Sequence, residues 1–243
     1  MKLLDTNGGN TKLRKNNKDI NIRVAGLSLY PIDTRICAFQ DIAQCKGPCL
    51  SDSGFAKVYE SVNQSRMAKT NLYLNERKKF IELLKYELTN FERLCLKQSV
   101  IPYVRLNVIS DIQYELKANG CIPQSFPNIK FFDYTKIAKR LGKTPDNYEL
   151  MFSFSKAPEY KSSVLKALKT DVPISVVFLG EIMPRMFLDR EVVDGDKSDI
   201  ENLVHKNKII GLKYKSVGNK IDPRDSLFIV VVDDVVEQNM ESI

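Results

Sequence analysis

Residues 22–49 read IRVAGLSLYPIDTRICAFQDIAQCKGPC and join a strand-like segment to three closely spaced cysteines. Ile22 to Leu29 is apolar enough to be a buried strand of a parallel sheet. Cys37, Cys45 and Cys49 follow it with the spacing Cys-x7-Cys-x3-Cys. Three soft ligands directly after a strand are typical of a metal or cluster site. This stretch therefore predicts the start of a sheet and the place of its chemistry.

Further along the chain, apolar runs of strand length alternate with stretches of helical spacing. We expect strands at Tyr103 to Ile109, Ile129 to Phe132, Leu150 to Phe154, Ile174 to Leu179, Ile209 to Tyr214 and Leu227 to Val232. We expect helices at Ala56 to Thr70, Asn75 to Lys97, Tyr134 to Leu141 and Ser162 to Lys169. This alternation predicts an α/β fold, a single (β/α) barrel or partial barrel with the three-cysteine loop after its first strand.

The length and composition favour one domain. The chain has 243 residues, 43% of them hydrophobic, which suits one barrel-sized core. We expect a flexible, polar and basic N-terminal segment over residues 1–19 and a single barrel-like domain over residues 20–243. The start lacks the apolar region of a secretory signal, and no span of transmembrane length follows. We therefore expect a protein of the cytoplasm of a bacterial host cell, with no membrane partner, whose five cysteines are thiols or metal ligands rather than disulfides.

The charge balance indicates the kind of partner. A net charge of +7 predicts contact with an anionic small molecule or a nucleic acid. Because acidic residues are interspersed with the basic ones, ordinary solvated faces are the alternative interpretation.

Polar residues gather at and after the ends of the expected strands, which form the functional face of a barrel. As catalytic candidates we select Asp111, Asp133 and Lys136. As substrate- or cofactor-binding candidates we select Arg105, Asn107, Tyr134, Ser153 and Lys213. Structural alternatives stay open: Arg105 could pair with Asp111 or Asp133, and Asp133 could cap a helix starting near Tyr134. The run Asp194, Gly195, Asp196 and Asp199 is either a capped turn or a hard-cation site.

Several familiar chemistries are disfavoured. His205 is the only histidine, which argues against Ser-His-Asp and Cys-His catalysis. Gly142-Lys143-Thr144 resembles the end of a P-loop, but Ile137 stands where the leading glycine belongs. No Gly-x-Gly-x-x-Gly follows a strand.

The cysteines have three interpretations. A structural zinc needs four closed ligands and would have to recruit Cys95, Cys121, Asp41 or His205. An iron–sulfur cluster, most simply [4Fe-4S], can use Cys37, Cys45 and Cys49 alone and leave one iron open. Inert thiols are the third interpretation, and the core stripe of Asn75 to Lys97 already predicts that role for Cys95.

Several motifs together resemble the phage and plasmid gene product 88 family over residues 10 to 230. They are Gly26-Leu27-Ser28-Leu29, the cysteine loop, Ala68-Lys69-Thr70 before Arg77, Val104-Arg105-Leu106-Asn107 with Ser110-Asp111, Phe132-Asp133-Tyr134-Thr135-Lys136, Phe152-Ser153, Val193-Asp194-Gly195-Asp196 with Asp199, and Gly211-Leu212-Lys213. The resemblance implies a bacteriophage or mobile-element protein whose strand-end polar residues form one constellation. It implies no particular reaction.

A second similarity concerns architecture. Radical S-adenosylmethionine enzymes also carry three cysteines after the first strand of a β/α barrel, with the spacing Cys-x3-Cys-x2-Cys, and the intervals here are wider. This similarity implies an iron–sulfur enzyme of unknown substrate that uses S-adenosylmethionine. The alternative is a non-catalytic, zinc-stapled module that binds nucleic acid or a host protein, and a third hypothesis is a magnesium- or manganese-dependent hydrolase.

Overall fold

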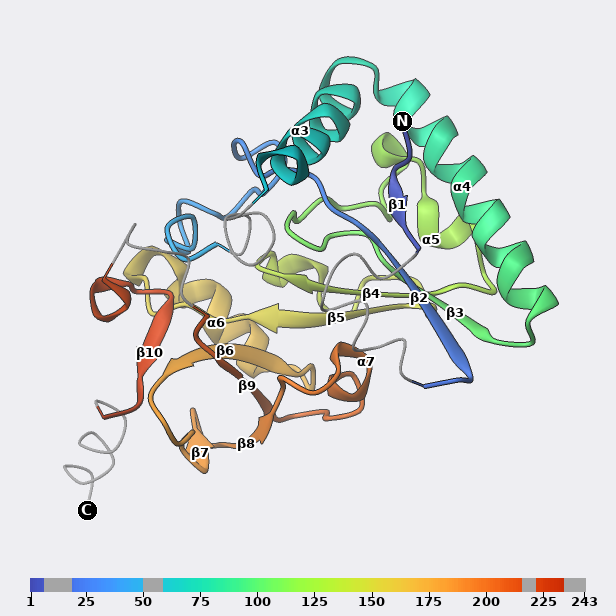
Figure 1. Cartoon of the computed structure of the whole chain (residues 1–243). Helices are drawn as coiled ribbons and strands as arrows, with labels where there is room; N and C mark the ends of the chain where they lie inside the picture. The colour runs from blue at the N-terminus through green and yellow to red at the C-terminus, as the bar shows by residue number, and fades with distance from the viewer. Residues whose placement is uncertain (7–18, 50–58, 216–221, 234–243) are drawn as a thin grey trace.

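The structure is a computed structural model that describes residues 1–6, 19–49, 59–215 and 222–233 (Figure 1). Its centre is a ten-stranded sheet with the order β1-β2-β3-β4-β5-β6-β9-β8-β7, and β10 pairs with β6. The strands are β1 (Leu4–Asp5), β2 (Ile22–Leu27), β3 (Ile101–Arg105), β4 (Lys130–Thr135), β5 (Tyr148–Ser153), β6 (Ile174–Leu179), β7 (Met186–Phe187), β8 (Arg190–Asp194), β9 (Ile209–Lys213) and β10 (Ile229–Val231).

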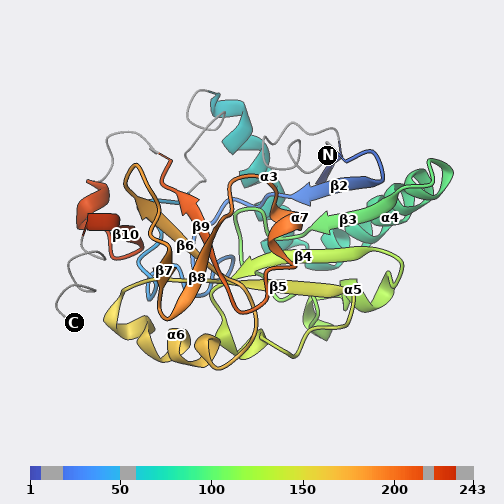
Figure 2. The same ribbon diagram turned by 90° about the horizontal axis from the view of Figure 1, so that it is seen from below.

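The sheet is mostly parallel. Neighbouring strands from β2 to β6, and then β9 and β8, all pair in parallel, while β1 on β2 and β7 on β8 are antiparallel. Strand β10 pairs in parallel with the C-terminal half of β6, where β5 has already ended. Figure 2 shows β2 to β5 running crosswise to β6, β8 and β9, so the sheet is strongly twisted. The predicted α/β class with a parallel sheet is confirmed, and closure into a barrel stays a prediction.

The helices are α3 (Glu60–Asn75), α4 (Arg77–Lys97), α5 (Ile122–Ser125), α6 (Lys161–Leu168) and α7 (Asp199–Asn202). Helix α4 packs against β3 and next to α3 (Figure 1). Its buried residues recur at intervals of three or four, as a helix with one core-facing stripe requires: Phe80, Leu84, Leu88, Phe91 and Cys95. The prediction that Cys95 packs in the core is therefore confirmed.

The sheet buries side chains on both faces. In β4, Phe131 belongs to the main hydrophobic cluster, whereas the next residue, Phe132, belongs to a second, smaller cluster. Leu203, which directly follows α7, completes that second cluster. Helix α7 and the turn after it therefore cover the face of the sheet opposite the main cluster.

The helix predicted at Tyr134 to Leu141 is wrong. Strand β4 continues to Thr135, because Tyr134 and Thr135 pair with Met151 and Phe152 of β5. Aromatic and β-branched residues suit a strand, and pairing outweighs the weak helical spacing. Only a 3-10 turn, Ala138–Arg140, follows. The interpretation of Asp133 as a helix cap is wrong for the same reason, since Asp133 lies inside β4.

The N-terminal residues also differ from expectation. Strand β1 lies inside the segment 1–19, which we expect to be flexible, polar and basic, and Leu3 and Leu4 are buried. The carboxylate of Glu87 on α4 accepts the backbone N–H groups of Leu3 and Leu4, at 2.8 and 2.7 Å. Because β1 precedes β2 in the chain, the cysteine loop follows the second strand and not the first. Residues 7–18, and residues 56–58 of the helix expected at Ala56 to Thr70, lie outside the described residues.

In the described ranges, no helix has the length and apolar composition needed to cross a membrane.

Candidate functional site

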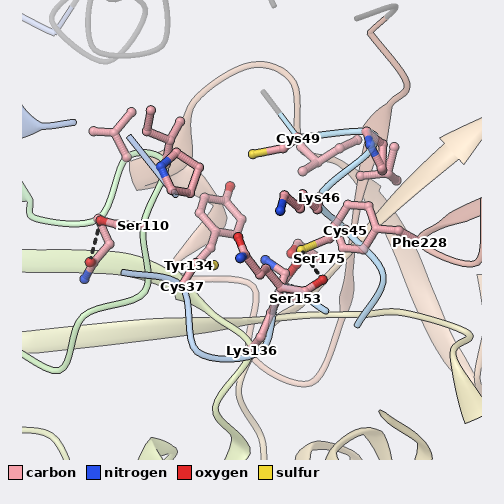
Figure 3. A pocket seen from close by; sticks show the side chains of 18 of the residues that line it. Cys37, Cys45, Lys46, Cys49, Ser110, Tyr134, Lys136, Ser153, Ser175 and Phe228 are labelled. Carbon is pink, nitrogen blue, oxygen red and sulfur yellow. Dashed lines mark hydrogen bonds between the residues drawn. The ribbon is translucent and has the colours of Figure 1, made fainter. Parts of the chain in front are cut away.

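A cavity of about 250 Å³ opens at the carboxyl ends of the parallel strands (Figure 3). Its wall includes residues from the loops after β2 and β3, the ends of β4, β5 and β9, the middle of β6, and Phe228 just before β10. Ligand sites of parallel α/β folds lie at this edge of the sheet. The cavity is therefore the candidate functional site.

The cysteine loop forms one side of the cavity. Cys37, Cys45 and Cys49 all line it, and Figure 3 shows their side chains approaching it from different positions on the loop. Cys37 and Cys45 are buried, whereas Cys49 is partly exposed. The structure thus brings the three predicted ligands to one cavity.

Backbone hydrogen bonds give the loop its shape. The N–H of Cys37 donates to the carbonyl of Asp33 at 3.1 Å, and the N–H of Cys45 donates to the carbonyl of Gln40 at 3.1 Å. The loop is also tied to its surroundings, because the hydroxyl of Ser155 donates to the carbonyl of Ala43 at 2.7 Å. These bonds help to hold the cysteines at the cavity.

The thiols lie beside a cation. Burial raises the pKa of Cys37 to about 12, and the nearby Lys136 ammonium partly opposes this rise. Burial also raises the pKa of Cys45, and the Lys136 ammonium partly opposes this rise as well. Thiolates, not thiols, bind metals. A bound cation or cluster would therefore have to displace the thiol protons, and Lys136 makes that displacement easier.

The spacing of the ligands bears on which metal could bind. A tetrahedral zinc with Zn–S bonds of about 2.3 Å needs its sulfurs about 4 Å apart. Among the residues that the structure describes, no three His, Cys, Asp or Glu side chains are grouped to hold one ion. A cluster spreads its thiolates over several iron atoms, so its ligands stand farther apart. The described residues therefore form no grouped site for a single ion, and a cluster at the three thiols stays a prediction.

Lys136 is held firmly at the end of β4. Its backbone N–H donates to Asp111 at 2.7 Å, and its carbonyl accepts the hydroxyl of Tyr160 at 2.9 Å. Its ammonium lies 5.4 Å from the centre of the Phe228 ring. The side chain therefore reaches into the cavity from a backbone that is fixed on both sides.

Arg105 is buried in the wall of the cavity, with 4% of its surface exposed. Its Nη1 lies 2.8 Å from Asp199 of α7, and its Nε lies 3.9 Å from Asp133. The guanidinium also stacks over the ring of Tyr134 at 4.7 Å, and the Tyr134 hydroxyl donates to Asp199 at 2.8 Å. The predicted ion pair of Arg105 with Asp133 is present at this longer distance, and Asp199 is its closer partner.

Asp111 and Asp133 are not among the residues that line the cavity. Asp133 accepts the backbone N–H of Asn107 at 2.7 Å and the hydroxyl of Tyr148 at 2.8 Å. Burial raises its pKa to about 6, against the opposing effect of Arg105. Asp111 pairs with Arg140 at 2.8 Å. Both carboxylates thus support the backbone behind the cavity.

The remaining candidates do line the cavity. They are Asn107, Tyr134, Ser153 and Lys213, together with Arg105, Lys136 and the three cysteines. Asn107 is oriented by Asp133 and in turn accepts the hydroxyl of Ser110 at 2.9 Å. The wall also contains Lys46, Ser175 and Phe228, which our sequence reasoning did not select. For Ser175 the sequence does contain a signal, because a serine stands inside the otherwise apolar strand Ile174 to Leu179.

The acidic run after β8 divides between two roles. Asp196 lines the cavity, accepts the backbone N–H of Lys213 at 2.8 Å and pairs with the Lys215 ammonium at 2.9 Å. Asp199 joins Arg105 instead. Asp196 thus serves in a turn, in agreement with the capped-turn interpretation of this run. Asp199 forms an ion pair that sequence spacing did not predict.

Comparison with known proteins relates the chain to a family. A family model described as gene product 88 matches residues 1–228. No curated protein and no solved structure matches the chain. The matched range contains every residue that lines the cavity, from Tyr30 to Phe228.

Proposed function

The chain belongs to the gene product 88 family, and on that premise we propose that it is a phage or mobile-element iron–sulfur enzyme. Cys37, Cys45 and Cys49 would hold the cluster, which is a [4Fe-4S] cluster if each cysteine binds one iron. The observation that carries this proposal is that three thiols face one cavity at the carboxyl edge of a parallel sheet. Three protein ligands leave one iron open to a cofactor or substrate.

The donor set suits such a cluster. Thiolates are its usual ligands, and the loop that carries them is shaped by its own hydrogen bonds. The Lys136 ammonium offers a positive charge next to sulfur ligands that become negative on binding. When bound, the cluster would supply one-electron transfer, and with S-adenosylmethionine at its open iron it would supply radical chemistry.

The rest of the wall is suited to an anionic substrate. Lys46, Lys213 and Lys215 line the cavity with Arg105 and Lys136, whereas Asp196 is the acidic residue among the described residues of the wall. Charge-assisted hydrogen bonds from such groups bind carboxylates and phosphates well. Ser153 and Tyr134 add polar groups in the wall for orienting the bound molecule. We therefore propose an anionic small molecule as the substrate class.

The predicted catalytic residues take separate roles in this proposal. Lys136 is the one that lines the cavity, so it is the candidate for direct contact with cluster or substrate. Asp111 would act through it, by holding its backbone N–H. Asp133 would act through Asn107, whose backbone and side-chain amides both donate to the Asp133 carboxylate.

The test is the optical spectrum and the iron and sulfide content of protein purified without oxygen. We expect broad absorbance near ~400 nm from sulfide-to-iron charge transfer, with iron and sulfide in equal amounts. Cys37→Ser, Cys45→Ser and Cys49→Ser should each lose most of both elements. Cys121→Ser, a change outside the cavity wall, should retain them. Wild-type protein with neither element would overturn the proposal.

A second candidate function follows from the net charge of +7. In this version the chain is a zinc-stapled or metal-free module that binds nucleic acid or a host protein. It predicts affinity for DNA or RNA that falls steeply as the salt concentration rises, because phosphate contacts release counterions. Salt-dependent nucleic-acid binding by wild-type protein free of iron would favour it over the enzyme.

A further inference from the structure

We propose that Lys136 sets the reduction potential of the cluster by holding its ammonium group in the cavity that the three cysteines line. This inference rests on the proposed function, because it requires a cluster at the three cysteines. It makes Lys136 a positioning residue that acts on the electron transfer through a cluster ligand. The structure supports it in three ways.

The first support is the rigid placement of Lys136. Its N–H and carbonyl are bound by Asp111 and by Tyr160, at 2.7 and 2.9 Å. The same Tyr160 hydroxyl donates to the Ser153 carbonyl at 3.0 Å, so the ends of β4 and β5 are tied together. The Phe228 ring lies against the ammonium at 5.4 Å. The backbone of Lys136 is thus held by hydrogen bonds that remain when its side chain is substituted.

The second support is the shared cavity. Lys136 and the three cysteines all line it (Figure 3), and the positive charge of Lys136 acts on Cys37, Cys45 and Cys49. Reduction adds one negative charge to a cluster. A nearby positive charge stabilises the reduced form, and so it raises the potential.

The third support is the charge balance of the cavity. The other cations of the wall are either paired, as Arg105 is with Asp199 and Lys215 is with Asp196, or exposed, as Lys46 and Lys213 are. Within the described part of the chain, no carboxylate forms a salt bridge with Lys136. Exposed charges are screened by water and salt, whereas a charge inside the cavity acts more fully.

The test is a redox titration of the anaerobically purified protein, with the cluster reduced by dithionite and followed by electron paramagnetic resonance. Lys136→Met and Lys136→Gln should lower the equilibrium constant for reduction at least tenfold, which is about 59 mV for one electron. Lys136→Arg keeps the charge and should stay close to wild type. Lys46→Met removes an exposed lysine from the same wall and should have a smaller effect than either neutral variant.

The outcomes separate the two proposals. A wild-type protein without iron and sulfide overturns the cluster itself and this inference with it. Normal cluster content with equal potentials in wild type, Lys136→Met and Lys136→Gln overturns the inference alone. If both neutral variants lack a cluster while Lys136→Arg contains one, the lysine is required for assembly, and the tuning role is overturned as well.

Discussion

Arg105 and Asp199 form a buried ion pair, with the guanidinium Nη1 2.8 Å from the carboxylate Oδ2. Arg105 is the last residue of β3 and Asp199 is the first residue of α7, so the pair joins segments 94 positions apart. It fixes α7 over the sheet and holds Arg105 in the cavity wall. The pair therefore links the fold to the candidate site.

Replacing Arg105 with Met should destabilise the protein strongly. The change keeps much of the volume but leaves Asp199 and Asp133 buried without their cation. Removing one partner of a buried pair costs about 3–5 kcal/mol of unfolding free energy. Urea unfolding of wild type and variant measures this loss. As a control, Lys208→Ala removes an exposed pair with Glu191 and should cost less than about 1 kcal/mol. Equal losses in the two variants would contradict the role given to Arg105.

Asp133 should make stability depend on pH. Burial raises its pKa to about 6, compared with about 3.9 in an unfolded chain. The folded protein therefore holds this proton more tightly than the unfolded chain does. The stability that the group contributes is complete below about pH 4, and it is lost as the pH rises to about 6.

The variant Asp133→Asn isolates this effect, because its amide does not titrate. The unfolding free energy of wild type minus that of the variant should fall by roughly 2 kcal/mol between pH 4 and pH 7, which is most of the total effect of roughly 3 kcal/mol at 1.36 kcal/mol for each unit of pKa. Urea unfolding at pH 4, 5, 6 and 7 measures the difference. A constant difference over this range would show that Asp133 titrates normally.

Replacing Tyr160 with Phe should loosen the cavity wall. The Tyr160 hydroxyl lies 2.9 and 3.0 Å from the carbonyls of Lys136 and Ser153, which share its one proton, and its ring stacks on Phe152. Phe keeps the stack but leaves two carbonyls without this donor, which costs about 1–3 kcal/mol. We expect lower stability and faster amide exchange at the ends of β4 and β5.

The exposed Tyr86 supplies the control for this change, because Tyr86→Phe alters a hydroxyl on the surface of α4. Its unfolding free energy should stay within about 0.5 kcal/mol of wild type. A similarly small change in Tyr160→Phe would mean that the two carbonyls find other donors.

Replacing Glu87 with Ala should release strand β1. The Glu87 carboxylate accepts two backbone N–H groups, and hydrogen bonds to charged groups contribute about 1.5–3 kcal/mol. Hydrogen exchange at the amides of Leu3 and Leu4 should therefore become much faster. Glu82→Ala on the exposed side of α4 should leave their exchange unchanged. Slow exchange in Glu87→Ala would show that pairing with β2 is enough to hold β1.

The sequence predicts most of the strands, because an apolar run is a local signal. Ile174 to Leu179 coincides with β6, and the stripe from Phe80 to Cys95 correctly predicted α4. The errors arose where pairing outweighs local preference. Tyr134 and Thr135 carry a helix-like spacing, but β5 holds them in a strand. The two-residue strands β1 and β7 are too short to leave a periodic pattern.

In the candidate site, too, local signals were predictable from the sequence and long-range pairing was not. Polar residues at strand ends are visible in the sequence, because parallel strands bring their carboxyl ends to one edge. The sequence cannot show how such residues pair. Asp111 and Asp133 have the same local setting as Lys136, yet Arg140 and Tyr148 engage the two acids behind the wall while Lys136 reaches the cavity.

By itself, the sequence determined the α/β fold class, the mostly parallel pairing of the strands and the three thiols of one loop, since these depend on local periodicity and spacing. Only the tertiary structure decided which charges are neutralised and which face the cavity. The physical reason is distance: ion pairs such as that of Arg105 with Asp199 join segments that are close only after the chain has folded. The placement of Lys136 in the same cavity as the three cysteines was likewise decided by packing and not by sequence spacing.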